Sequence, residues 1–169
     1  IKNGLTQLKT MGTNTLFLES GVHIVTGKKK YVSIEEPILI YGAGRDETIV
    51  QGGFMIKGNK EEGKKVELKN MTVKGAKNNG LNAKNGLSFL CDSMTFTQCG
   101  GCGVFAQKTK GRLINCVITQ CEMSGTFCRE NALIELEGSQ TKVDGNGTGG
   151  SSGHYGLNTY NTSSRIHLL

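Results

Sequence analysis

The 169-residue chain has no tryptophan, a single proline (Pro37) and few aromatic residues, which make up 6% of it. It has no run of 18 apolar residues, so no segment is predicted to span a membrane as a helix. Helical spacing of apolar residues is nearly absent, which excludes a largely helical fold. The length predicts one domain over residues 1–169, with enough mass to bury a core.

An initiating methionine and an apolar leader are also missing, because the chain begins at Ile1. We expect a trimmed piece of a longer protein or a mature product. The apolar ending "RIHLL" predicts a further strand. Three sequons, at Asn70, Asn146 and Asn161, would accept glycans only in a secretory setting, so the compartment stays open.

Glycine and positive charge, in contrast, are abundant. Glycine accounts for 25 residues, and lysine plus arginine exceed the acids by 20 to 14, which gives a net charge of +6. This balance favours anionic partners such as polyuronates or nucleic acid, and it is equally ordinary as a solubility feature. We predict a protein or polysaccharide partner and neither a membrane nor nucleic acid.

A glycine followed by a short alternating strand recurs along the chain. The units are "GFMI" (53–56), "GLNA" (80–83), "GVFA" (103–106), "GTFC" (125–128) and "GLNT" (156–159). A second pattern lies within the units: "LKNMTV" (68–73), "LCDSMTF" (90–96), "LINCVI" (113–118) and "LEGSQTKV" (136–143). Alternation predicts strands, and the pairs Lys69-Asn70 and Ile114-Asn115 predict corners between them. Self-similarity at a period of about 22–25 residues is typical of a solenoid.

Two other solenoids are excluded by their own patterns. A leucine-rich repeat would need the pattern L-x-x-L-x-L-x-x-N, and a hexapeptide β-helix would need a repeat of six residues. Neither pattern is present. The segment "VSIEEPILIYGAGRDETIVQGG" (32–53) resembles the first coil of the pectate-lyase-like superfamily, and residues 80–128 resemble the β-helix repeats of F-box substrate adaptors. The resemblance spans roughly residues 13–169 and implies an all-β, right-handed parallel β-helix of about five to seven coils.

This register stacks like residues on like, since neighbouring rungs lie about 4.8 Å apart. It predicts that Cys99, Cys116, Cys121 and Cys128 point inward, with Cys99 directly above or below Cys121. A disulfide between these two would fit the spacing, but we favour a ladder of reduced thiols. The "CGGC" at residues 99–102 is a C-x-x-C without a second such pair. We therefore predict no metal site and no cofactor.

The predicted function follows from the absence of acidic side chains at the outward positions of the strands. Enzymes of the resembled superfamily mark their sites with clustered acids and bases, and the outward positions of the best strands carry none. We predict a non-catalytic β-helix binding or scaffold module with a protein or carbohydrate contact face. The alternative is a polysaccharide lyase or glycoside hydrolase acting on an acidic polysaccharide. A third class is a metal or redox role of the cysteines.

Candidate residues exist for the binding and the catalytic interpretations. Met55, Phe105 and Phe127 share an outward column, and we expect Phe105 and Phe127 to stack with an offset at about 4.8 Å and to need a cover. Lys64 and Lys65 lie in a basic cluster that could bind anions. If the protein is an enzyme, "GHYG" and "SRIH" faintly resemble polygalacturonase motifs and point to Asp144, His154 and Arg165. Self-association through an exposed sheet or an open coil end is a further expectation.

Overall fold

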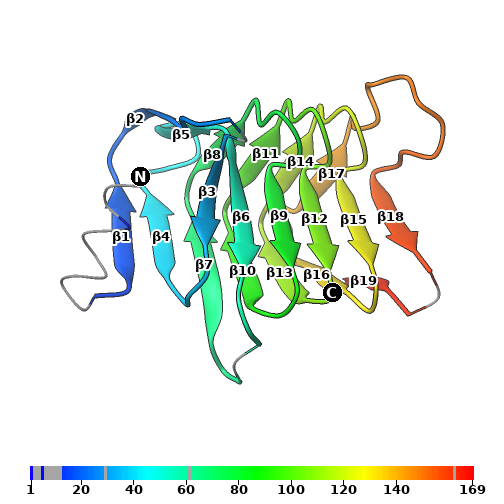
Figure 1. Cartoon of the computed structure of the whole chain (residues 1–169). Coiled ribbons are helices and arrows are strands. Elements are labelled where there is room, and N and C mark those ends of the chain that lie inside the picture. Colours follow the sequence, from blue (N-terminus) through cyan, green and yellow to red (C-terminus); the bar gives the residue numbers. More distant parts are fainter. Residues whose placement is uncertain (2–4, 6–12, 29, 61, 162) are drawn as a thin grey trace.

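The chain folds into three parallel β-sheets that surround one core (Figure 1). The structure is a computed structural model that describes residues 1, 5, 13–28, 30–60, 62–161 and 163–169. All of the elements in these ranges, β1 to β19, are strands.

Sheet A has seven strands and runs the length of the molecule. Its strands are β1 (Thr15–Leu18), β4 (Leu39–Gly42), β7 (Lys65–Lys69), β10 (Ser88–Asp92), β13 (Lys110–Ile114), β16 (Leu133–Glu137) and β19 (Arg165–Leu168).

Sheets B and C have six strands each. Sheet B contains β2 (Gly21–Ile24), β5 (Thr48–Gln51), β8 (Thr72–Lys74), β11 (Thr95–Thr97), β14 (Val117–Thr119) and β17 (Lys142–Asp144). Sheet C contains β3 (Tyr31–Ile34), β6 (Gly53–Lys57), β9 (Leu81–Lys84), β12 (Val104–Gln107), β15 (Thr126–Arg129) and β18 (Leu157–Tyr160).

Successive strands visit sheets A, B and C in turn, so each coil contributes one strand to each sheet. Strands three apart in the chain pair in parallel, as β9 does with β6 and with β12. This path is a parallel β-helix of six coils with β19 beginning the next. The all-β solenoid predicted from the repeat is confirmed.

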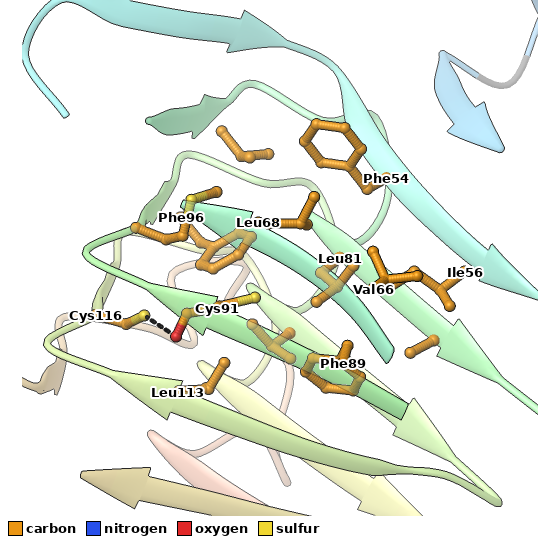
Figure 2. Packing of buried hydrophobic residues seen from close by; sticks show 14 of the residues in the cluster. Phe54, Ile56, Val66, Leu68, Leu81, Phe89, Cys91, Phe96, Leu113 and Cys116 are labelled. Atoms are coloured by element: carbon orange, nitrogen blue, oxygen red, sulfur yellow. Dashed lines mark hydrogen bonds between the residues drawn. The ribbon is translucent and has the colours of Figure 1, made fainter. Parts of the chain in front are cut away.

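The register agrees with the columns read from the sequence. Val73, Phe96, Ile118 and Val143 are partners along sheet B, and Phe54, Leu81, Val104 and Thr126 are partners along sheet C. Most of these side chains are fully buried, because alternate residues of a strand point to the same face. Figure 2 shows Phe54, Leu81 and Phe96 within this shared interior.

The predicted cysteine ladder is confirmed as well. Cys99, Cys116, Cys121 and Cys128 have no exposed surface, and all six cysteines are free thiols. The amide of Glu122 donates to the carbonyl of Cys99, and the amide of Gly147 donates to that of Cys121, which places these residues on neighbouring rungs. In Figure 2 the Cys116 thiol points to the carbonyl oxygen of Cys91, 3.5 Å away.

The corners between sheets repeat a backbone conformation. Asn70, Ser93 and Asn115 end the sheet A strands with φ of 54°, 53° and 51°, in the left-handed region. Asparagine tolerates that region better than most residues, since its short side chain can bond to nearby backbone. The corners predicted at Lys69-Asn70 and Ile114-Asn115 are therefore where the chain turns. Each corner keeps the next strand in register with the coil before it.

Candidate functional site

The outer face of sheet C presents two parallel columns of side chains. The first column holds Ser33, Met55, Asn82, Phe105, Phe127 and Asn158. The second column, two residues further along each strand, holds Lys57, Lys84, Gln107, Arg129 and Tyr160. Both columns face out, opposite to the buried side chains between them. We call this surface the sheet C face.

The strands that build the sheet C face contain no acid and no histidine. Their sequences are YVSI, GFMIK, LNAK, VFAQ, TFCR and LNTY. A general acid or base is most often histidine, aspartate or glutamate, so none of these common groups is supplied by the strands themselves. The face offers cations, amides and aromatic rings instead.

Phe105 lies at the centre of the sheet C face beneath two cations. The Nζ atom of Lys84 is 5.4 Å from its ring centroid, and the Cζ atom of Arg129 is 5.3 Å from it. The ring is 8% exposed. Because the cation of each long side chain is held by the quadrupole of the ring, Phe105 is a platform for Lys84 and Arg129. The sequence predicted that something covers the Phe105 ring, and the side chains of Lys84 and Arg129, from neighbouring strands of sheet C, do so.

Phe127 meets Phe105 edge to face. The ring centroids are 5.6 Å apart and the rings are inclined by 62°. The sequence-based expectation of offset stacking at about 4.8 Å is wrong, because the rung spacing fixes the backbones and leaves the rings free to tilt. A tilted pair brings the positive edge of one ring to the negative face of the other. Phe127 is half-buried and remains accessible on this face.

Hydrogen bonds orient the Arg129 side chain. Its Nη2 donates to Oε1 of Gln107 at 3.0 Å, and Nε2 of Gln107 donates to Oε1 of Glu130 at 2.8 Å. Lys108 also lies 3.4 Å from Glu130. The hydrogen bond from Gln107, together with Lys108 and Arg129, lowers the pKa of Glu130, which stays ionised. This carboxylate, at the corner after β15, also forms an ion pair with Arg129, with Oε1 at 3.4 Å from Nε.

A basic depression of about 310 Å³ opens at the first coils of the sheet C face. Its lining includes four lysines, Lys28, Lys30, Lys57 and Lys84, and no acidic residue. Met55, predicted as a binding residue, forms part of the wall. Like charges this close raise the local positive potential, which attracts anions.

Tyr31 forms another wall of the basic depression, and its ring lies over Gly53 on the next coil. Burial raises the pKa of the Tyr31 phenol, and hydrogen bonds with the Asn82 side chain and the Asn79 backbone offset part of this effect. The Tyr31 hydroxyl and Oδ1 of Asn82 are both buried, and their contacts fall short of strict hydrogen-bond geometry.

Lys64 and Lys65 do not belong to the sheet C face. Lys65 begins β7 in sheet A, where its Nζ lies 3.5 Å from Glu67. The chain crosses the corner after Lys57 before it reaches them, so their closeness in sequence does not carry over into one surface. They stay predicted binding residues without a connection to Met55, Phe105 and Phe127.

The catalytic candidates are on separate elements. Asp144 ends β17 of sheet B, His154 lies in the loop before β18, and Arg165 begins β19 of sheet A. Lys142 bonds to Asp144 at 2.9 Å and lowers the pKa of its carboxyl. Within the described ranges, no hydrogen bond or ion pair joins any two of these three residues. Their catalytic role stays a prediction.

The cysteines do not form a metal centre in the part of the chain that the structure describes. No group of three or more histidine, cysteine, aspartate or glutamate side chains there is arranged to hold a metal ion. Desolvation by burial raises the pKa of Cys102 and Cys116 to about 11 and that of Cys128 to about 12. Protonated, enclosed thiols are poor nucleophiles and poor ligands. The described residues also include no helix that is long and apolar enough to cross a bilayer.

Sequence reasoning missed Lys84, Arg129, Tyr31 and Asn82. A signal for the first two was present. Each lies four residues after an aligned glycine, Gly80 and Gly125, and the same offset from Gly53 gives Lys57. In a strand, every second residue points to the same face, so the residue four after each glycine faces outward like the residue two after it. These residues form the second column of the face. Asn82 lies two residues after Gly80, the same offset that separates Phe105 from Gly103, so its outward position follows from the repeat. For Tyr31 the sequence carries no comparable signal.

Comparisons with known proteins agree with this architecture. The family described as "Right handed beta helix region" matches residues 17–168. Among solved structures, the A-module of the Azotobacter vinelandii mannuronan C-5 epimerase AlgE4 is similar, with a TM-score of 0.63 and 13% sequence identity. The alignment covers 87% of this chain and 53% of that one, so the chain spans about half the length of the module. The comparison with curated proteins finds no match.

Proposed function

Because this chain belongs to the right-handed β-helix family, we propose that it is a non-catalytic binding module whose sheet C face holds an acidic polysaccharide. One observation carries the proposal: cations and aromatic rings are aligned on this face, and its strands contain no acid. A polyuronate offers carboxylates to the cations and apolar sugar faces to the rings.

The cations on this face are held in place before any ligand arrives. Lys84 and Arg129 both rest on Phe105, and Gln107 bonds to Arg129. Side chains that are already ordered lose less conformational entropy on binding, which raises affinity. Lys57 and Lys84, partners on adjacent strands, continue the same column into the basic depression.

The direction of the column suits a linear polymer. Successive positions lie one strand spacing apart, about 4.8 Å, along the axis of the β-helix. A polysaccharide lying along this axis would meet the cations one after another, and several weak contacts on one polymer add up to useful avidity. The similar A-module is named for mannuronan, itself a polyuronate, which supports this ligand class.

The alternative of a lyase or hydrolase finds less support in the described residues. Hydrolysis needs two carboxyl groups on either side of the bond. The strands of the sheet C face offer none, and Asp144, His154 and Arg165 come from different elements. We therefore favour a binding function over a catalytic one.

Affinity electrophoresis in gels containing polygalacturonate or polymannuronate tests the proposal. The variant Lys84→Ala/Arg129→Ala should bind at least tenfold more weakly than the native chain. Lys110→Ala/Arg112→Ala removes the same charge from β13 of sheet A and serves as the matched control, with a change of less than about twofold. Equal losses in the two variants would contradict a site on the sheet C face. Release of unsaturated products or of reducing ends by the native chain would instead establish the enzymatic alternative.

A further inference from the structure

Three asparagine–glycine pairs lie in the part of the chain that the structure describes: Asn79–Gly80, Asn85–Gly86 and Asn146–Gly147. A fourth, Asn3–Gly4, is outside the described residues. Asparagine is thermolabile in proteins, and it is most labile before glycine, because glycine has no side chain to hinder attack by its own amide nitrogen. The three described pairs have the same sequence, so any difference between them comes from the fold.

Hydrogen bonds to the neighbouring coil hold the first pair. The amide of Cys102 donates to Oδ1 of Asn79 at 2.9 Å, and the amide of Gly80 donates to the carbonyl of Cys102 at 3.0 Å. The side chain that would be attacked and the nitrogen that would attack it are therefore both fixed.

The third pair is held even more firmly. The Asn146 side chain makes three hydrogen bonds to backbone groups. The amide of Gly147 donates to the carbonyls of Cys121 and Met123, at 2.9 and 2.7 Å. Reaction at this pair would require all of these bonds to open.

The second pair, at the corner between β9 and β10, has none of these restraints. The Asn85 side chain is exposed, and it makes no hydrogen bond with a residue that the structure describes. Within the same ranges the Gly86 amide donates to no backbone carbonyl. This amide can turn toward the Asn85 side chain without losing a backbone hydrogen bond of its own.

The corner also requires the glycine that makes Asn85 labile. Gly86 has a φ of 131°, and a Cβ atom there would lie 2.6 Å from the carbonyl oxygen of Gly58. A larger residue at this position would be strained and would clash with the loop before β7.

We propose that Asn85 is a site of spontaneous deamidation in the folded protein. The amide nitrogen of Gly86 attacks Cγ of Asn85, and the side-chain nitrogen leaves as ammonia with the proton of the attacking amide. The product is a cyclic succinimide. Water then attacks either imide carbonyl and breaks its bond to nitrogen, which leaves aspartate or isoaspartate. Water is the only reactant added, and no electrons are transferred.

The new carboxylate would change the charge of the sheet C face. Deamidation lowers the net charge of +6 by one, directly after Lys84, whose Nζ lies over Phe105. A negative charge beside this cation opposes the approach of a polyanion. This consequence rests on the proposed function, whereas the modification itself does not.

Peptide mapping of the aged, folded chain by mass spectrometry tests the modification. Trypsin cleaves after lysine and arginine, so the three pairs fall into separate peptides, 78–84, 85–108 and 143–165. Asn85 should deamidate at least about tenfold faster than Asn79 and Asn146, because the held pairs react only after local opening. In urea, which removes this protection, the three rates should agree within about twofold. An unaged sample corrects for deamidation during digestion.

Equal rates at the three pairs in the folded chain, or a slower rate at Asn85, would overturn the proposal. Affinity electrophoresis with polygalacturonate tests the consequence separately. Asn85→Asp should bind about twofold more weakly than the native chain, and Asn14→Asp, which adds the same charge at an exposed position before β1, should bind like it. Equal binding by the two variants would refute the effect on the face. If the native chain does not bind this probe, the proposed function fails while the deamidation rates still decide the modification.

Discussion

The ring of Phe89 fills the space above Gly111 on the next coil, where a Cβ atom would lie 2.0 Å from its Cζ. Phe89 is an inward residue of β10, and Figure 2 shows its ring within the packed interior. Gly111→Ala therefore forces a displacement of the ring. We expect a loss of about 2 kcal/mol in the free energy of unfolding, measured by urea denaturation.

Two further variants test whether the stability loss of Gly111→Ala comes from a clash with Phe89. Gly44→Ala adds the same atom where the nearest neighbour is 3.6 Å away, and it should change stability by less than about 0.5 kcal/mol. Phe89→Leu in the Gly111→Ala background should recover part of the loss by making room. Additive effects of the two substitutions would contradict direct contact.

Asn146 should be important for stability because its amide serves three backbone groups. Its Oδ1 accepts from the amide of Cys121, and its Nδ2 donates to the carbonyls of Ile118 and Asp144. Asn146→Ala should lower the unfolding free energy by about 2 kcal/mol, since these backbone groups lose their partner. Asn59→Ala, at an exposed loop position, is the control. An equal effect at both sites would show that the Asn146 bonds contribute nothing net.

Stability should decline at alkaline pH because of the buried thiols. Cys102, Cys116 and Cys128 have a pKa raised by burial from 9.0 to about 11 or 12. Below pH 9 the thiols are protonated in the folded and unfolded chains alike, so their contribution is fully present. Above pH 9 the unfolded thiols ionise first, and this contribution is lost as the pH approaches 12. At pH 10 we expect a loss of about 1 kcal/mol for each thiol.

Urea unfolding of the native chain and of Cys128→Ala at pH 8 and pH 10 measures this effect. The variant is less stable at both values, but the difference between native and variant should shrink at pH 10. A constant difference would mean that Cys128 ionises equally in the two states.

Phe105 and Phe127 should differ in their effects on binding. Phe105→Leu keeps apolar volume under Lys84 and Arg129 but removes the π face that holds them, so polygalacturonate binding should weaken about fivefold. Phe127→Leu, a ring with no cation over it in the described structure, is the matched control. Equal weakening in both variants would show that the rings act by contact with the sugar alone.

Serine at these positions should also separate the two rings. If both rings were fully exposed at their outward positions, replacing them by serine would have little effect on folding. The burial of Phe105 changes that expectation, and Phe105→Ser should reduce stability by about 2 kcal/mol. Phe127→Ser should reduce it less, because its ring is more exposed. Urea denaturation of each single variant measures the difference.

The sequence predicted the backbone well because the solenoid repeats its constraints. Each aligned glycine begins or directly precedes a strand of sheet C, so one register error would have reversed all columns at once. Phe96 and Ile118 are therefore partners as expected. Leu157 is the partner of the buried Thr126, yet it is 39% exposed because its strand is the edge of sheet C.

The candidate site was predicted only in part because it depends on side-chain conformation. The column of Met55, Phe105 and Phe127 follows from strand alternation, and it is present. That Lys84 and Arg129 cover Phe105 depends on long, flexible chains whose rotamers no spacing rule fixes. Lys64 and Lys65 were predicted from a basic cluster in the sequence, and the corner after Lys57 separates them from that column.

Strand pairing in all three sheets joins each coil only to its immediate neighbours. A whole coil can therefore be duplicated or removed in evolution without disturbing the register on either side. Every added coil would lengthen the sheet C face by one rung. If the face binds a linear polymer as proposed, the number of coils would set the length of polymer that it contacts, and avidity could change without altering a single contact residue.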